Sequence, residues 1–100
     1  MVKMRDESSA VALRELIDST SLTDIVMLEV GSYAGESADI FASTGKVAKL
    51  FCIDPWRPGY DSRDIASSSN FTEVEQAFDK VMAKHPRVIH KFKGTLQDFV

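Results

Sequence analysis

The sequence predicts an α/β fold built on an open parallel sheet. Three apolar runs, at residues 25–30, 50–54 and 88–93, have the length and composition of strands, and a helical segment separates each run from the next. Strands that alternate with helices are joined by parallel crossovers. The predicted order is a helix followed by β-α-β-α-β. This is the first half of a Rossmann-like, doubly wound parallel sheet with an added N-terminal helix.

The first predicted elements are a helix and a buried strand. Residues 1–7 are polar and charged, and we interpret them as a loose leader. Residues 8–18 are predicted to be helical because apolar side chains recur on one face, at Ala10, Leu13, Leu16 and Ile17. Residues 25–30 follow as a strand. Because the first four of them are all apolar, we expect this strand to be buried on both faces.

The middle of the chain is predicted to hold a helix, a strand and a long loop. Residues 35–44 are interpreted as a helix, with Gly45 as its C-terminal stop. Residues 50–54 form the second strand. Residues 55–69 are rich in Pro, Ser and Asp, and they are predicted to form a loop that is mobile without ligand.

The last third of the chain begins with the best helical pattern. Asn70 is a helix N-cap with Glu73 three residues later, and the apolar positions that follow have helical spacing: Val74, Ala77, Phe78, Val81 and Met82. His85-Pro86 ends this helix. Residues 88–93 are the third strand, and residues 95–100 resemble the start of another helix. The chain ends within that element, so we expect residues 1–100 to be a truncated half-domain. A minimal three-strand domain completed by oligomerisation is the alternative.

Composition excludes several classes of function. A net charge of −3 without a basic block gives no electrostatic indication of nucleic-acid binding. The N-terminus has no apolar signal region, and no apolar run approaches the roughly 18 residues of a membrane span, so we expect a cytoplasmic protein. The single cysteine, Cys52, excludes an internal disulfide and is expected to be a core residue. No cluster of His, Cys and Asp has metal-ligand spacing.

The most informative motif is Glu-Val-Gly-Ser-Tyr-Ala-Gly-Glu-Ser at residues 29–37. It connects a predicted strand to a predicted helix through two glycines, which lets backbone N–H groups approach a ligand. Asp54 ends the next strand, nineteen residues after Gly35. A carboxylate at that position can accept hydrogen bonds from the two hydroxyls of a ribose. Together they predict a site for an adenosine-type ligand.

Two other glycine-loop families fit less well. The dinucleotide fingerprint G-x-G-x-x-G lacks its middle glycine here, because Tyr33 stands at that position. A P-loop is disfavoured because Gly45-Lys46 closes a helix and is followed by Val47. An NAD- or nucleotide-sugar-binding oxidoreductase half-domain therefore remains one alternative. A non-catalytic Rossmann-like binding module is the other.

The motif at residues 29–37 resembles the first motif of class I S-adenosylmethionine-dependent methyltransferases. Phe-Cys-Ile-Asp-Pro-Trp at residues 51–56 is similar to their second motif, and Lys-Gly-Thr at residues 93–95 falls where such enzymes surround the adenine. The sequences of the first two motifs are most similar to the small-molecule branch grouped as methyltransferase family 24. The resemblance covers about residues 23–100 and implies the N-terminal, cofactor-binding half of a transferase that uses S-adenosylmethionine.

The resemblance implies roles for the residues of the first motif. Gly31 and Gly35 would let the loop backbone pass beneath the methionine and ribose portions of the cofactor, with Ser32 and Tyr33 between them in the same site. Glu29 would orient the methionine ammonium. From the residues alone, Tyr33 could equally cover the adjacent helix, and Glu29 could be an ordinary charge at a strand end.

The resemblance also implies roles after the second and third strands. Asp54 would bind both ribose hydroxyls, Pro55 and Trp56 would flank the adenine, and Thr95 and Leu96 would contact the adenine edge from their backbone. The sequence alone leaves Trp56 equally open to a role as a loop anchor packed on the helix after Asn70, and Asp54 to one as a strand terminator.

The resemblance places the remaining functional parts outside this chain. In the family four more strands follow the third, and they carry most substrate-binding and catalytic groups, so the catalytic residues are unknown and we expect this piece alone to be inactive. The expected partner is a small-molecule substrate, without nucleic acid or membrane. Because no fourth strand covers the strand at residues 25–30, we expect that strand to pair with the C-terminal half or with another copy.

Overall fold

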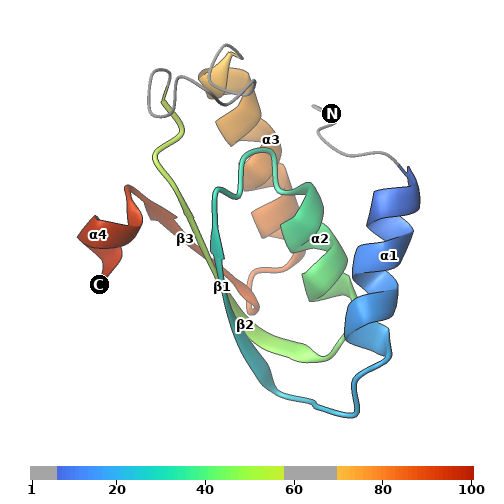
Figure 1. Cartoon of the computed structure of the whole chain (residues 1–100). Helices are drawn as coiled ribbons and strands as arrows, with labels where there is room; N and C mark the ends of the chain where they lie inside the picture. Colours follow the sequence, from blue (N-terminus) through green and yellow to red (C-terminus); the bar gives the residue numbers. More distant parts are fainter. Residues whose placement is uncertain (1–6, 58–69) are drawn as a thin grey trace.

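The computed structural model describes residues 7–57 and 70–100 and confirms the predicted α/β fold class. Its elements are α1 (Glu7–Asp18), β1 (Ile25–Val30), α2 (Glu36–Ser43), β2 (Val47–Asp54), α3 (Phe71–Lys84), β3 (Ile89–Lys93) and α4 (Leu96–Phe99) (Figure 1). The strands form one parallel sheet in the order β1-β2-β3. A helix lies between successive strands, as in a partial Rossmann-like half-fold.

The largest difference in element bounds is at the start of β2. The sequence predicts this strand from residue 50, whereas it begins at Val47. The polar Lys49 interrupts the apolar run there, but backbone pairing with β1 continues through it and matches Val26 to Lys49. The predicted leader also differs, because Glu7 already belongs to α1. Residues 1–6, and residues 58–69 of the predicted loop, lie outside the described part of the chain.

The three longer helices lie on one side of the sheet, and α4 lies on the other (Figure 1). The core lies between the sheet and this helical layer, and its most deeply buried side chains are Leu50, Cys52, Ile53, Val74 and Phe78. The helices α2 and α3 pack directly on strands, whereas α1 packs mainly on α2. The site described below is therefore supported from one side by α2 and α3.

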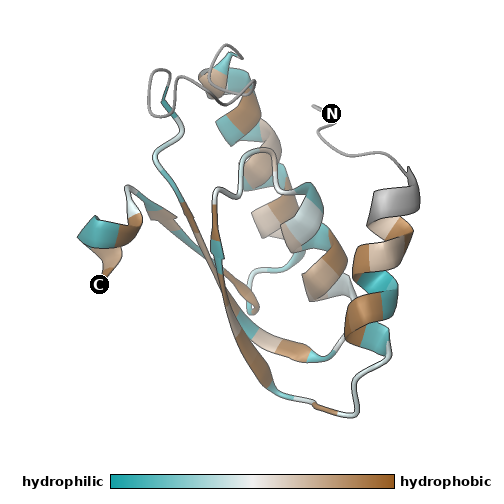
Figure 2. Cartoon of the chain, viewed as in Figure 1, coloured by the Kyte–Doolittle hydropathy of each residue, from teal (hydrophilic) through white to brown (hydrophobic). Residues whose placement is uncertain are grey.

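The predicted burial of β1 on both faces is wrong. Its residues alternate between half-buried and exposed, and the exposed ones are Val26 at 63%, Leu28 at 49% and Val30 at 53%. Figure 2 shows hydrophobic residues along this strand. The reason is that α4 covers this face only over β2 and β3, where the Phe99 ring lies 6.0 Å from the ring of Phe51 and 5.3 Å from that of Phe92. No other described helix packs on that face.

Polar side chains make contacts at the C-terminal ends of α1 and α3. The Lys46 ammonium donates hydrogen bonds to the carbonyls of Asp18 and Thr20, both at 2.6 Å, and thereby caps the C-terminus of α1. Asp39 of α2 accepts from Lys84 at 2.9 Å and lies 2.8 Å from the ring nitrogen of His85, the C-cap of α3. Burial opposes ionisation of Asp39, but these two partners lower the pKa of its carboxyl group.

Two glycines with left-handed backbone provide a matched test of packing. Gly35 has φ +87°, and a Cβ added there would lie 3.1 Å from Phe78 and 3.2 Å from Val81. Gly45 has φ +77° with nothing within 4 Å. We expect Gly45→Ala to cost about 1 kcal/mol through backbone strain. Gly35→Ala should cost about 2–4 kcal/mol because overpacking adds to the same strain. Urea unfolding measures both, and equal costs would contradict close packing at Gly35.

The open face and edge of β1 predict association. Exposed apolar strand edges recruit further strands, and no described strand pairs with the outer edge of β1. We expect residues 1–100 alone to sediment as concentration-dependent oligomers, and Leu28→Lys to shift them towards monomer by placing a charge on this surface. Ala48→Lys, at an exposed position on β2, is the control. A monomeric parent at high concentration would contradict the prediction.

Candidate functional site

The candidate site lies at the carboxyl end of the sheet. The turns that follow β1 and β2 lie side by side there (Figure 1), and the backbone N–H of Gly31 donates to the carbonyl of Ile53 at 2.8 Å. A pocket of about 230 Å³ opens at the first of these turns, lined by Glu29, Val30, Gly31, Ser32, Tyr33, Ala34, Glu36 and Ser37. Ligands of open α/β sheets bind at this end of the strands.

The pocket brings together one part of the predicted site. Four residues predicted from the first motif line it: Glu29, Gly31, Ser32 and Tyr33. Gly31 has φ +84°, and its missing Cβ leaves room beside the Tyr33 ring, whose nearest atom would be 3.6 Å away. The fifth predicted residue of this motif, Gly35, is buried and does not line the pocket. Its lack of a side chain serves the contact with α3 described above.

The pocket lining is acidic. Glu29 and Glu36 contribute carboxylates, and none of the described lining residues is Lys or Arg. The start of α2, where Glu36 and Ser37 lie, adds the partial positive charge of a helix N-terminus. The site can therefore accept hydrogen bonds from a cationic group while its backbone amides remain donors. Sequence reasoning missed Glu36 and Ser37 as site residues, although their place at the N-terminus of a predicted helix was a signal for them.

A buried hydroxyl and a buried thiol lie beneath the loop. Ser32 is 5% exposed, and its Oγ has no hydrogen-bond partner of suitable geometry among the described residues. Burial raises the pKa of the nearby Cys52 thiol to about 12; the Ser32 hydroxyl opposes this rise and the Glu29 carboxylate adds to it. Cys52 is thus an inert core residue, as the sequence indicated, whereas Ser32 keeps a polar atom without a partner at the pocket wall.

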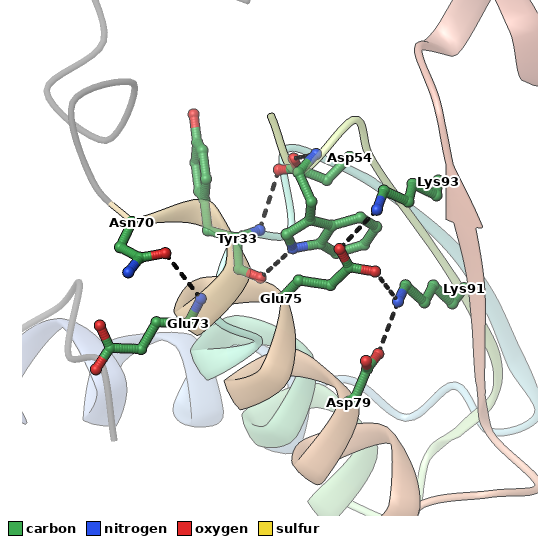
Figure 3. A network of polar contacts seen from close by, with 9 residues as sticks. Tyr33, Asp54, Asn70, Glu73, Glu75, Asp79, Lys91 and Lys93 are labelled. Carbon is green, nitrogen blue, oxygen red and sulfur yellow. Dashed lines mark hydrogen bonds and ion pairs between the residues drawn. The ribbon is translucent and has the colours of Figure 1, made fainter. Parts of the chain in front are cut away.

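Asp54 does not line the pocket, although it contacts Tyr33, which does. Its side chain is 2% exposed. One carboxylate oxygen accepts the backbone N–H of Tyr33 at 3.1 Å, and the other accepts the backbone N–H of Trp56 at 2.7 Å (Figure 3). Both of these residues have positive φ, +48° for Tyr33 and +46° for Trp56. In this structure the predicted ribose-binding carboxylate is used to join the two turns.

Trp56 is anchored on α3. Its Nε1–H donates to the carbonyl of Tyr33 at 2.7 Å, and its ring centroid lies 4.8 Å from that of Phe78. The Lys91 ammonium lies over the same indole, 5.1 Å from the ring centroid. Of the two roles that the sequence left open for Trp56, the structure therefore shows the loop anchor packed on the helix.

The lysine above the indole belongs to an ion-pair network between β3 and α3 (Figure 3). Lys91 donates to Glu75 at 2.6 Å and to Asp79 at 2.8 Å, and Lys93 donates to the other oxygen of Glu75 at 2.7 Å. Burial alone would lower the pKa of Lys91, but the two carboxylates raise it. The two lysines lower the pKa of Glu75. Lys91 is thus a structural cation that joins β3 to α3.

The remaining predicted site residues lie outside the pocket lining. Pro55 is half-buried between Asp54 and Trp56. Thr95 is the N-cap of α4 and forms a capping box with Asp98, and Leu96 is an exposed residue in the first turn of that helix. The Gly94 N–H donates to the Asp54 carbonyl at 3.1 Å, so this segment adjoins the carboxyl end of β2. The third motif is therefore near Asp54 but separate from the pocket.

Other candidate groups have structural surroundings. His90 stacks on Phe51 with ring centroids 5.2 Å apart, on the face opposite the helical layer. Within residues 7–57 and 70–100, no three His, Cys, Asp or Glu side chains are grouped so that they could bind a metal ion. In the same part of the chain, no helix has the length and apolar character needed to span a membrane.

Comparison with known proteins adds no relative. No protein-family model matches the chain, and no curated protein matches it. The site must therefore be interpreted from its own geometry and chemistry.

The ion-pair network predicts a dependence of stability on pH. Because the folded state lowers the pKa of Glu75 from its usual 4.5, the pairing stabilises the protein above that pH and is lost as the pH falls through the lowered value. We therefore expect Glu75→Gln to be less stable than the parent at pH 7. The difference should vanish at low pH, where the parent carboxyl is protonated.

Thermal unfolding of parent and variant between pH 7 and pH 3 measures this difference. Glu73→Gln, an exposed carboxylate on the same helix, is the matched control and should show a smaller difference at pH 7. A Glu75→Gln deficit that does not shrink as the pH falls below 4.5 would contradict the assignment.

Proposed function

We propose that this chain is the cofactor-binding portion of an S-adenosylmethionine-dependent methyltransferase. The observation that supports this proposal most is the acidic pocket at the glycine loop after β1, whose lining includes Glu29, Gly31 and Glu36. Its position at the carboxyl end of a parallel sheet supports binding of a nucleoside-type cofactor. The motif resemblance at residues 29–37 supports the same cofactor.

Charge distinguishes between the candidate cofactors. The pyrophosphate of a nicotinamide dinucleotide carries two negative charges, and it would lie beside the carboxylates of Glu29 and Glu36. S-adenosylmethionine instead carries a positive sulfonium and a positive ammonium. The acidic lining attracts these groups, while the amides at the start of α2 can bind the ligand's carboxylate.

The residues present fit the amino-acid end of this cofactor. Ser32 offers a buried hydroxyl without a partner among the described residues, and Ser37 adds a second hydroxyl to the lining. The pocket, about 230 Å³, is smaller than the roughly 300–1,000 Å³ usual for ligand sites. We therefore assign it to the methionine portion, with the nucleoside extending past Tyr33.

The proposed reaction is transfer of the sulfonium methyl group to a small-molecule acceptor that is not identified. The cofactor supplies an already activated methyl group, so the protein contributes chiefly positioning and exclusion of water. In this chain, Glu29 and Glu36 would orient the charged groups of the cofactor, and Gly31 would provide the close approach. We assign no catalytic residue, expect residues 1–100 alone to be inactive, and propose a cytoplasmic location.

One observation favours a second candidate, a Rossmann-like module without catalytic activity. Asp54 is buried, and its oxygens accept backbone N–H groups of both turns. A carboxylate used in this way stabilises the fold whether or not a ligand binds. The binding experiment below distinguishes the two candidates, because such a module need not bind S-adenosylhomocysteine.

The test is calorimetry with S-adenosylmethionine, S-adenosylhomocysteine and NAD. We expect the first two to bind weakly and NAD not to bind. Gly31→Val should lower the affinity by at least tenfold, because its side chain would enter the pocket beside Tyr33 and oppose φ +84°. Gly45→Val is the matched control, since it carries similar backbone strain at φ +77° away from the pocket.

The outcomes separate the candidates. Binding that is lost in Gly31→Val but kept in Gly45→Val supports a cofactor site at this loop. Binding of NAD in preference to S-adenosylhomocysteine would favour the oxidoreductase alternative. No binding of any of the three ligands by the folded parent would contradict the proposal and favour the non-catalytic module.

A further inference from the structure

We propose that Asp54 is a positioning residue that clamps the two turns of the site together and does not bind the ribose of a ligand. The resemblance to methyltransferases implies the opposite role for this carboxylate. The contacts of Asp54 with Tyr33 and Trp56, and its burial, support the clamp.

The two residues that Asp54 binds share an unusual backbone. Tyr33 and Trp56 both have positive φ, although neither is glycine. Residues with a side chain adopt this conformation only where their surroundings enforce it. Each donates its backbone N–H to a different oxygen of the same carboxylate. A single charged group, 2% exposed, thus supports both strained positions.

A third hydrogen bond closes the arrangement. The Trp56 indole N–H donates to the carbonyl of Tyr33 at 2.7 Å. Asp54, Tyr33 and Trp56 therefore form a closed ring of three hydrogen bonds, two of which join the turn after β1 to the turn after β2 (Figure 3). Phe78 of α3 and Lys91 of β3 both contact the indole and so fix its position.

The position of the pocket separates it from the carboxylate. The pocket is lined by the backbone segment from Gly31 to Ala34, and Asp54 is not part of the lining. Tyr33 lies between the two, because it lines the pocket and also donates its N–H to Asp54. The carboxylate can therefore act on a ligand through the shape of this segment. Because Asp54 is 2% exposed, a ribose could reach its oxygens only if the two turns moved apart.

The first experiment needs no ligand. In Asp54→Asn the side-chain NH₂ group, a donor, replaces one of the two accepting carboxylate oxygens. One of the two backbone N–H groups therefore loses its partner. We expect the Tyr33 and Trp56 amides to exchange hydrogen at least tenfold faster than in the parent, while the Cys52 amide is unchanged. The emission of Trp56, the only tryptophan in the chain, should shift to the red.

Asp39→Asn is the matched control for the loss of a carboxylate. It breaks contacts between α2 and α3 that involve Lys84 and His85, away from the pocket lining. It should leave the two exchange rates and the emission unchanged. Unchanged exchange at Tyr33 and Trp56 in folded Asp54→Asn would overturn the clamp. If Asp54→Asn does not fold, exchange in the parent decides, because the clamp requires protected Tyr33 and Trp56 amides, and exchange of both at the rate of an unstructured chain would overturn it.

The second experiment rests on the proposed function and uses two ligands that differ only in the ribose hydroxyls. These are S-adenosylhomocysteine and its 2′,3′-dideoxy analogue, each titrated into the parent and Asp54→Asn. Loss of a positioning residue changes the shape of the pocket for both ligands. We therefore expect the substitution to weaken the binding of the two ligands by the same factor, within about twofold. A loss of tenfold or more that appears only with the hydroxyl-bearing ligand would overturn the proposal.

The two experiments fail in different ways. If the folded parent binds neither ligand, the proposed function is wrong, and the exchange measurement alone decides the role of Asp54. If both ligands bind and exchange at Tyr33 and Trp56 is unchanged in Asp54→Asn, the cofactor assignment stands and the clamp is wrong.

Discussion

The parallel register of β1 and β2 is the constraint on which the site depends. It pairs Val30 with Ile53, so both strands end at the same level and the turns that follow them lie side by side. The Asp54 carboxylate can then reach the backbone of Tyr33 and of Trp56 at once. A shift of one residue would turn Asp54 to the other face of the sheet and break both contacts.

The support beneath this junction comes from α3. Phe78 contacts the Trp56 ring and also limits the space at Gly35, so one apolar side chain packs under both turns. The ion pairs of Lys91 with Glu75 and Asp79 hold β3 against the same helix. Because the described helical layer covers one face of the sheet, the site is rigidly supported from that side, whereas Val26, Leu28 and Val30 stay exposed on the other.

The charges of the site are divided between two places. The carboxylates of Glu29 and Glu36 line the pocket, whereas Lys91 and Lys93 of β3 are paired with a carboxylate of α3. The pocket is therefore acidic, although β3 at the other edge of the sheet is basic. This separation depends on where each side chain points, and it is the basis on which we propose a sulfonium cofactor and not a dinucleotide.

The sequence by itself determined the fold class, the order of helices and strands along the chain and the position of the glycine loop. Apolar runs, the Asn70 cap and the glycines are local signals, and they depend on backbone preferences within a few residues. The pocket residues Glu29, Gly31, Ser32 and Tyr33 were predicted from the resemblance of this loop to a methyltransferase motif. The exposure of β1, the engagement of Asp54 and the anchoring of Trp56 were decided only by the tertiary structure. Each depends on which distant residue lies opposite, and no local pattern in the chain encodes that neighbour.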